Sequence, residues 1–251
     1  MLIKETKKDN LICKVFSDRD DMGKNAAKVV SDKIKELLNV QDTVNVVFAA
    51  APSQNDVLKY LVQADVDWGR VNAFHMDEYI GLEPCAKQTF ANYLKEHIFD
   101  KVNFKKVNYI GSGAVDSVIS NYEKLLKENA IDIVCLGIGE NAHIAFNDPW
   151  TADFEDEKLI KVVELDQTCR NQQVNDGCFE SIDKVPKQAV TLTIPTLCSA
   201  KFMCCVVPTK LKANAVYNTM TKDITTEVPS TILRKHANAI MFTDADAASL
   251  L

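Results

Sequence analysis

Three groups of polar side chains follow apolar runs of the sequence, in positions where they could carry out chemistry. The first group is His75, Asp77 and Glu78, at the end of the run VNAFHM. Neighbouring carboxylates at a strand end point to opposite sides, so we expect only one of them to face a cleft, where it would act as a general base. A solvated acidic turn that begins a helix, or a metal site made by all three residues, would use the same side chains.

The second group lies in the segment GIGENAHIAFNDP, which follows the run IDIVCL. His143 stands five residues before Asp148, in a loop that a strand end would make rigid. The imidazole could exchange protons near neutral pH, and a carboxylate would hold its tautomer and stabilise its charged form. The alternative is a loop histidine that is hydrogen-bonded only to the backbone. Gly137 and Gly139 permit a tight turn, but the third glycine of a dinucleotide-binding fingerprint is missing.

The third group is cationic. The segments TCRNQQ and PTKLKANAV contain Arg170, Lys210 and Lys212, and Arg234 and Lys235 follow nearer the C-terminus. A phosphorylated substrate needs few cations when backbone amides help to bind it, and Lys212 stands near the start of an expected helix. Ordinary surface charge would explain most of these side chains equally well.

The elements that position these groups alternate between short apolar runs and amphipathic segments. Seven runs are rich in β-branched residues, and they begin at Val44, Val71, Ile131, Ile160, Ala189, Lys201 and Asn238. Near-continuous apolar runs are typical of strands that are buried on both faces, as in a parallel sheet. The chain therefore predicts an α/β fold, a three-layer α/β/α sandwich with a mainly parallel sheet, whose ligands bind at the carboxyl ends of the strands.

Three segments have the apolar spacing of helices and follow a residue that is favoured at a helix N-cap. A long first helix is expected after Ser17, a second helix after Ser53 and a third after Asp116. His97 lies on a helix face and His236 near a helix end, and we interpret both histidines as structural.

Composition and charge exclude several classes of protein. The 251 residues include 29 Lys+Arg against 35 Asp+Glu, and the net charge of −6 comes without a basic cluster, which argues against a nucleic-acid partner. No run reaches the roughly 18 apolar residues of a membrane span. The N-terminal segment MLIKETKKDN lacks the apolar core of a signal peptide. We therefore expect a cytoplasmic protein with no membrane partner.

The cysteines and the chain organisation add two expectations. The eight cysteines lack a CxxC pair or the spacing of a zinc site, so we expect reduced, mostly buried thiols and no metal. No linker or repeat divides residues 1–251, which we interpret as one domain. The least regular stretch, from about 145 to 185, predicts a lid or binding loop.

Five segments, MDEYIGL, QTFANYL, GIGENAHIAFNDP, TLTIP and PSTILRKHANAIMFTD, occur in this order over most of the chain. Together they resemble the glucosamine-6-phosphate deaminase (isomerase) family, which shares a Rossmann-like fold with 6-phosphogluconolactonases, ribose-5-phosphate isomerases and CoA transferases. A lactonase would be expected to continue with small, Ser-type residues after His143 in place of Ala-Phe-Asn. The resemblance implies an aldose–ketose isomerisation of an aminosugar phosphate with hydrolytic loss of ammonia, which needs neither a metal nor an organic cofactor.

The resemblance also assigns roles to residues. Asp77 falls on the family's general base, which moves a proton between C2 and C1 of the sugar. His143 falls on the residue that assists ring opening, and Asp148 and Asn141 complete a ring-opening unit with it. Each proton-transfer role is typically worth ~10²–10⁴ in rate.

The phosphate site is implied in the same way. Arg170 and Lys212 fall on phosphate-binding positions of the family. A glycine-rich loop with Ser or Thr is expected after the first strand, whereas this chain has AAAPSQND. Ser53 and the amides beyond Pro52 are therefore candidates for phosphate binding, with Ser53 as a helix N-cap the alternative.

Two further departures surround the histidine. Asn141-Ala142 stands where the family usually has Asp-Gly, and Asp148 stands where it usually has Glu. Asn141 can orient an imidazole but cannot stabilise the imidazolium by charge. Ala142 would be strained if its position requires a positive φ. We interpret these changes as the signature of a subgroup.

Taken together, the resemblance implies an enzyme that converts glucosamine 6-phosphate to fructose 6-phosphate and ammonia, in carbohydrate metabolism. Its expected partner is a small sugar phosphate, and relatives suggest that self-association is possible. Three alternatives stay open: a deaminase of the galactosamine epimer, a 6-phosphogluconolactonase-type hydrolase, and a non-catalytic sugar-phosphate-binding protein.

Overall fold

A central sheet of eight strands organises the computed structural model, which describes residues 1–175 and 177–251, without the side chain of residue 168. Across the sheet the strands are β1 (Leu2–Lys8), β2 (Leu11–Phe16), β11 (Ala239–Asp244), β10 (Phe202–Val207), β7 (Ile133–Leu136), β3 (Val44–Phe48), β4 (Val71–His75) and β6 (Lys106–Asn108). Only β1 and β2 pair antiparallel, and the other neighbours are parallel. The predicted α/β/α fold with a mainly parallel sheet is confirmed.

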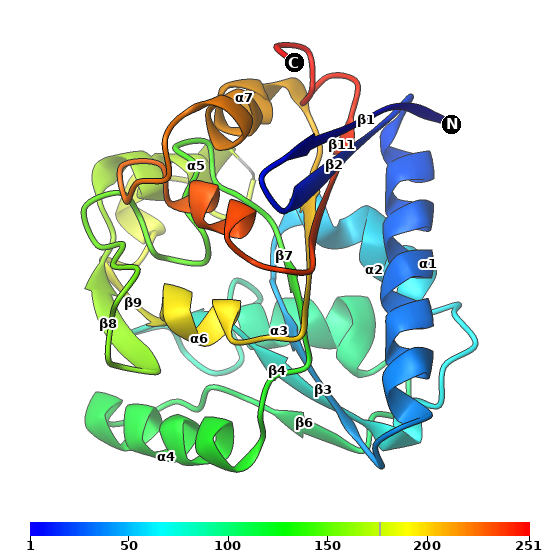
Figure 1. Cartoon of the computed structure of the whole chain (residues 1–251). Helices are drawn as coiled ribbons and strands as arrows, with labels where there is room; N and C mark the ends of the chain where they lie inside the picture. The colour runs from blue at the N-terminus through cyan, green and yellow to red at the C-terminus, as the bar shows by residue number, and fades with distance from the viewer. Residues whose placement is uncertain (176) are drawn as a thin grey trace.

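Helices cover both faces of this sheet (Figure 1). The helices of one layer are α1 (Arg19–Leu38), α2 (Asn55–Leu61), α3 (Phe90–Leu94) and η3 (Lys95–Phe99). Those of the other layer are α4 (Val115–Glu128), α6 (Ile194–Cys198) and α7 (Ala213–Thr221). Each layer buries its apolar side in a separate core cluster, so the strands between them are buried on both faces.

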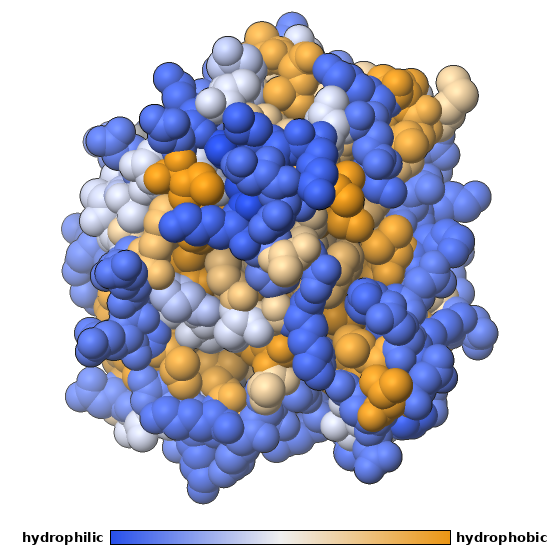
Figure 2. Space-filling view, viewed as in Figure 1, coloured by the Kyte–Doolittle hydropathy of each residue, from blue (hydrophilic) through white to orange (hydrophobic). Residues whose placement is uncertain are grey.

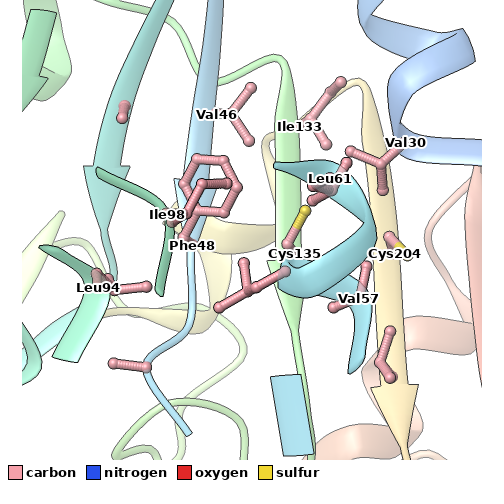
Figure 3. Close-up of a cluster of buried hydrophobic side chains, with 14 of the residues drawn as sticks. Val30, Val46, Phe48, Val57, Leu61, Leu94, Ile98, Ile133, Cys135 and Cys204 are labelled. Atoms are coloured by element: carbon pink, nitrogen blue, oxygen red, sulfur yellow. The ribbon is translucent and has the colours of Figure 1, made fainter. Parts of the chain in front are cut away.

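The two clusters explain why the strand sequences are apolar without interruption. Val46 and Phe48 of β3 face the layer of α2, where they share a cluster with Val57 and Leu61 (Figure 3). Val47, between them, belongs to the cluster on the opposite face. Successive side chains of a strand point to opposite faces, so a strand with a helix layer on each side has no polar face.

Two of the predicted strands lie outside the central sheet. β8 (Ile160–Glu164) and β9 (Gln188–Leu192) form a separate antiparallel sheet with β5 (Asp77–Tyr79). The strands were predicted correctly, but their expected place in the parallel sheet is wrong. The reason is that the chain beyond β4 continues into β5, which gives β9 an antiparallel partner away from the central sheet.

The N-terminal hairpin and β6 have no counterpart among the predicted strands. β1, with the sequence LIKETKK, is the exposed edge of the sheet, and its residues are mostly polar. β2 alternates buried and half-buried residues, which is not the pattern of a continuous apolar run. Apolar runs therefore locate the centre of the sheet and miss its edges.

The three predicted helices are present, but their caps differ from the expected ones. Asp18 rather than Ser17 caps α1, because its carboxylate accepts the backbone N–H of Asp21 at 2.8 Å. Neither Ser53 nor Asp116 caps its helix with its side chain. The spacing of apolar residues thus located the helices more reliably than the cap residues did.

The distribution of hydrophilic residues on the surface and the burial of the cysteines are those of an ordinary globular protein, as the composition indicates. Hydrophilic residues cover much of the face shown in Figure 2, with hydrophobic residues in separate patches among them. All eight cysteines are free thiols, five of them are buried, and only Cys85 is exposed. Among the helices described, none has the length and apolar character needed to cross a membrane.

The stretch from 145 to 185 is more regular than its sequence indicates. Residue 176 lies outside the described residues, and the described part contains β8, α5 (Gln167–Asn175) and η4 (Ile182–Lys184). The strand β8 anchors this stretch to β9, and α5 reaches the edge of the central sheet where the candidate site lies. Its role as a lid or binding loop stays a prediction.

Candidate active site

A cavity of about 220 Å³ lies where the carboxyl ends of the parallel strands meet. Its walls are the segments directly after β3, β4, β7 and β10, together with residues of α1, α3 and α5. Four of the predicted site residues line it, namely Ser53, Asp77, His143 and Lys212. The structure thus brings the expected base, the expected ring-opening histidine and two phosphate candidates to one opening, at the edge where open α/β sheets bind ligands.

Asp77 and Glu78 point to opposite sides of β5, as alternation along a strand requires. Asp77 lines the cavity, and no hydrogen bond to its carboxylate is found in the described part of the chain. Glu78 faces away, and its carboxylate accepts the backbone N–H groups of Tyr79, Phe90 and Ala91 at 2.9–3.0 Å. Glu78 therefore fixes the start of α3, and Asp77 alone is left for chemistry.

The surroundings of Asp77 favour proton uptake by its carboxyl group. Burial raises the pKa of the Asp77 carboxyl well above its ordinary value, and the negative charge of Glu78 raises it further. Phe90 and Phe146, whose rings stack with centroids 5.7 Å apart, form an apolar wall of the same cavity. A carboxyl whose pKa lies closer to the working pH is a more effective general base.

His75 is a structural residue. Its Nε2 accepts the backbone N–H of Ile110 at 2.7 Å, and its Nδ1 lies 3.0 Å from the carbonyl oxygen of Asp77. Complete burial lowers the pKa of His75 to about 4, so the ring is neutral. Both ring nitrogens are engaged, and this excludes the alternative of a metal site made by His75, Asp77 and Glu78.

His143 is held by a network with two side chains. Its Nδ1 lies 2.8 Å from Oδ1 of Asn141 and 3.0 Å from Oδ1 of Asp148. The Asn141 amide donates to the same Asp148 oxygen at 2.8 Å, and Oδ1 of Asn141 also accepts the backbone N–H of His143. Within the described residues Nε2 has no hydrogen-bond partner, so this nitrogen is the one left for a ligand in the cavity.

The backbone around His143 depends on two special positions. A Cβ at Gly139 would lie 2.1 Å from the His143 ring, so only glycine leaves room for the imidazole. Ala142 has φ +68°, in the left-handed region. The sequence predicts that an alanine at this position is strained if φ is positive, and the structure shows a positive φ. The alanine keeps the conformation that glycine would adopt at lower cost.

Asp148 supplies the charge that Asn141 lacks. Burial opposes ionisation of Asp148, but its interactions with His143, Asn141 and the Cys169 thiol outweigh it and lower the pKa of this carboxyl. The carboxylate lies 3.0 Å from Nδ1, where the sequence predicts that Asp148 would stabilise the charged form of His143. The negative charge that is missing at position 141, where the family usually has Asp, is therefore supplied by Asp148, whose Oδ1 lies 3.0 Å from Nδ1 of His143.

His143, Asp148 and Cys169 also form the one group among the described residues with three candidate metal-donor atoms within 4.8 Å of one another. Burial, and then the charges of nearby carboxylates, raise the pKa of the Cys169 thiol, which favours the thiol as a hydrogen-bond donor to Asp148 over a thiolate ligand. The Nδ1 atom is already engaged by Asn141 and Asp148. We therefore assign no metal to this group.

The phosphate candidates divide into two sets. Ser53, in η1 (Pro52–Gln54), and Lys212, in η5 (Lys210–Lys212), line the cavity. Arg170 does not line it, because its guanidinium donates to the carbonyl oxygens of Ile182 and Val185 at 2.5–3.2 Å. In this structure Arg170 holds the segment around η4, and its role in phosphate binding stays a prediction.

Several residues of the cavity were not anticipated from the sequence. They include Arg19, Gln172 and Gln173, of which the two glutamines reach the cavity from α5. The segment TCRNQQ contained the signal for Gln172 and Gln173, but only its arginine attracted attention. Nothing local marked Arg19, which stands among acidic residues at the start of α1.

The remaining histidines lie outside the cavity. His97 stacks on Tyr93 and its Nδ1 lies 2.7 Å from the Tyr93 carbonyl oxygen. Nε2 of His236 lies 2.8 Å from the carbonyl oxygen of Ala200. Both have the backbone contacts of structural residues.

Comparisons with known proteins agree with this geometry. The family model for glucosamine-6-phosphate isomerases/6-phosphogluconolactonase matches residues 17–242. The chain is 35% identical over 248 residues to a glucosamine-6-phosphate deaminase of Clostridioides difficile (strain 630), and the match covers 96% of each protein. It is 38% identical over 188 residues to a glucosamine-6-phosphate deaminase of Exiguobacterium sibiricum, which covers 74% of this chain and 73% of the relative.

Solved structures with the same fold include both branches of that family. A structure described as a monomeric glucosamine-6-phosphate deaminase superposes with a TM-score of 0.86 at 26% identity, over 96% of this chain and all of the other. A 6-phosphogluconolactonase from Thermotoga maritima superposes with a TM-score of 0.77 at 19% identity, over 93% of this chain and 99% of the other. At that identity the second likeness concerns the fold alone.

Proposed function

The chain belongs to the glucosamine-6-phosphate isomerase/6-phosphogluconolactonase family, and we propose that it is a deaminase that converts glucosamine 6-phosphate and water to fructose 6-phosphate and ammonia. The names of relatives at 35% and 38% identity support the deaminase branch. The observation that carries the proposal is that Asp77 and His143 line one cavity in contrasting environments. Among the described residues Asp77 has no hydrogen-bond partner, whereas His143 lies in a hydrogen-bonded network.

The reaction begins with opening of the sugar ring. In the proposal, Nε2 of His143 faces the ring oxygen and transfers a proton between that oxygen and the anomeric hydroxyl. Asp148 and Asn141 are positioning residues, since they hold Nδ1 and the carboxylate stabilises the imidazolium while the ring carries the proton.

Asp77 acts on the open chain. Its carboxylate removes the proton from C2, the C1–C2 double bond of an enolamine forms, and the aldehyde oxygen at C1 takes a proton from the substrate's ammonium group. Asp77 then returns its proton to C1. The resulting C2 imine adds water, the C2–N bond breaks, and ammonia and the ketose phosphate leave. Burial favours this role, because an ionised Asp77 in an apolar wall gains stability by taking up a proton.

In the proposal, the phosphate group anchors the substrate in the cavity. Lys212 supplies a positive charge and Ser53 a hydroxyl, and both line the cavity with Asp77 and His143. All steps are proton transfers and imine hydrolysis, so the proposed reaction requires no metal or organic cofactor. We further propose that the protein works in the cytoplasm, in the catabolism of amino sugars.

The alternatives make different demands on the same cavity. A lactonase hydrolyses an ester and needs no base beside a carbon acid, so it leaves the desolvated Asp77 without a role. A non-catalytic sugar-phosphate-binding protein would likewise gain nothing from a carboxylate that burial destabilises. A deaminase of the galactosamine epimer would use the same groups and differs only in the sugar that the cavity accepts.

One assay separates these functions. Purified protein is given glucosamine 6-phosphate, galactosamine 6-phosphate and 6-phosphogluconolactone, with ammonia, ketose phosphate and acid release measured side by side. We expect ammonia and fructose 6-phosphate in equal amounts from the first substrate. Acid release from the lactone without ammonia from either amino sugar would overturn the proposal, and binding without turnover of all three would favour the non-catalytic protein.

A further inference from the structure

The loop after β3 offers fewer phosphate donors than the glycine-rich loop that the family leads one to expect. It begins AAAPSQ, and Pro52 has no backbone N–H to donate. The N–H of Gln54 is already bound to the carbonyl oxygen of Ala51. A phosphate in this corner of the cavity therefore needs another donor that a different part of the chain provides.

A guanidinium group lies at this corner. Arg19, in the first turn of α1, lines the cavity with Pro52 and Ser53. Its Nη2 lies 3.4 Å from the carbonyl oxygen of Pro52, which places the side chain against the loop that lacks the amide. The Arg19 side chain keeps 42% of its surface exposed, so it is accessible to a ligand.

Asp56 of α2 fixes the direction of this guanidinium. Its Oδ2 accepts from Nε at 2.9 Å and lies 2.8 Å from Nη2. In residues 1–175 and 177–251, Nη1 has no hydrogen-bond partner, and it is the nitrogen left for a ligand. A fork held on one side by a carboxylate is pre-organised to bind a phosphate with its other donors.

The contact between α1 and α2 that brings these side chains together is built into the sequence. A Cβ at Gly23 would lie 2.5 Å from the Cβ of Asp56, so glycine is needed for the helices to approach this closely. A second pair holds the same turn of α1, since Asp20 accepts from Lys59 at 2.8 Å and from Tyr60 at 2.6 Å. The position of Arg19 is therefore fixed by packing.

We propose that Arg19 is a phosphate-binding residue of this chain, which, together with Lys212 and Ser53, recognises the phosphomonoester of the substrate and replaces the donors that the Ala-Pro loop lacks. A second phosphate-binding cation is needed because the guanidinium of Arg170 donates its hydrogen bonds to the carbonyl oxygens of Ile182 and Val185. The inference rests on the proposed function only for the identity of the sugar. The ligand chemistry it requires is a phosphate dianion.

The test compares Arg19→Gln with Lys59→Gln in the full-length protein. Both variants remove one cation that bridges α1 and α2, but Lys59 does not line the cavity. Binding of inorganic phosphate is measured by calorimetry at constant ionic strength, and KM and kcat are measured for glucosamine 6-phosphate. Asp56→Asn, which keeps the arginine but releases it, and thermal unfolding of every variant complete the set.

For Arg19→Gln we expect phosphate affinity to fall, and KM to rise, by about tenfold to a hundredfold. This change corresponds to the loss of one charge-assisted hydrogen bond. The kcat should stay within about threefold, because the chemistry at Asp77 and His143 is unchanged. Asp56→Asn should weaken phosphate binding by less than Arg19→Gln, and Lys59→Gln should leave it within about twofold.

Three results would overturn the inference: wild-type protein that does not bind phosphate, unchanged binding in folded Arg19→Gln, or equal losses in Arg19→Gln and Lys59→Gln. Ammonia release with an unchanged KM in Arg19→Gln would remove the inference and leave the proposed function standing. Conversely, if the wild type releases no ammonia but Arg19→Gln still loses phosphate binding, the inference stands and the proposed function is removed.

Discussion

The end of β4 and the loop after β7 both carry a histidine and a carboxylate, but the two regions use them in opposite ways. After β4, His75 is buried and neutral, with its pKa lowered to about 4, and burial raises the pKa of Asp77. After β7, His143 reaches the cavity, and the pKa of Asp148 is lowered by its hydrogen bonds against the effect of burial. In the proposed mechanism, aspartate carries the chemistry in the first region and histidine in the second.

In this proposal the surroundings of a group, and not its residue type, decide whether it exchanges protons. Asp77 faces an apolar wall and has no hydrogen-bond partner among the described residues, whereas Asp148 accepts a hydrogen bond from Asn141 and lies beside His143. In enzymes, two titratable groups whose environments push their pKa values apart commonly take the separate roles of acid and base.

The largest effect is expected for Asp77→Asn. The variant keeps the size of the side chain but cannot accept a proton, so ammonia release should fall by ~10²–10⁴ or more, with phosphate binding unchanged. The measurement is kcat for glucosamine 6-phosphate together with phosphate binding by calorimetry. Turnover close to that of the wild type would remove Asp77 as the base.

A smaller loss of activity is expected for His143→Gln. Sugars open slowly without help, so the loss should be roughly 10²-fold in kcat, less than for Asp77→Asn. The matched control is His97→Gln, which changes a histidine outside the cavity and should leave kcat within about twofold. Equal activity of the two histidine variants would contradict the assignment.

The two carboxylates should affect stability with opposite signs. Because the folded state raises the pKa of Asp77, its ionised form destabilises the protein at neutral pH, and Asp77→Asn should raise the free energy of unfolding. Asp148 has a lowered pKa, so it contributes stability above about pH 4 that is lost as the pH falls through its folded pKa. Asp148→Asn should therefore cost about 1–3 kcal/mol at neutral pH.

Denaturant unfolding at pH 7 measures both values. The expected result is a midpoint above that of the wild type for Asp77→Asn and below it for Asp148→Asn. Destabilisation by both substitutions would show that the two environments are not opposed in the way the structure indicates.

The smallest effect is expected at Ala142. Glycine adopts φ +68° without the penalty of a Cβ, so Ala142→Gly should stabilise the protein by about 1 kcal/mol. Thermal unfolding measures the change, and a Gly69→Ala variant, at a glycine without positive φ, serves as the reference. A lower Tm for Ala142→Gly would mean that the loop after β7 gains from the alanine by contacts that offset the strain.

Apolar periodicity was sufficient to predict the centre of the fold and the convergence of its strand ends. The runs from Val44, Val71, Ile131, Lys201 and Asn238 became central strands because both their faces are covered. The strands at Ile160 and Ala189 were misplaced, since pairing with β5 depends on where the chain goes after His75, which periodicity does not encode.

The candidate site shows the same limit. Asp77 and His143 follow strands, so their common location was predictable from topology. The placement of Arg19 depends on the approach of α1 to α2 at Gly23, and the hydrogen bonds from Arg170 to Ile182 and Val185 depend on the path of the chain after α5. The contacts of Arg19 and of Arg170 each join segments that are distant in the sequence, and no local sequence pattern marks such contacts.

The most direct test of the contrast is a titration of the aspartate carboxyls by carbon-13 NMR in the free protein, with Asp77→Asn and Asp148→Asn to assign the two signals. The signal lost in Asp77→Asn should titrate well above the ordinary aspartate value of about 3.9, and Glu78→Gln should move it to lower pH. The signal lost in Asp148→Asn should titrate below that value. Ordinary titration of both carboxyls, or the reverse order, would contradict the assignment of Asp77 as the base and Asp148 as the fixed partner of His143.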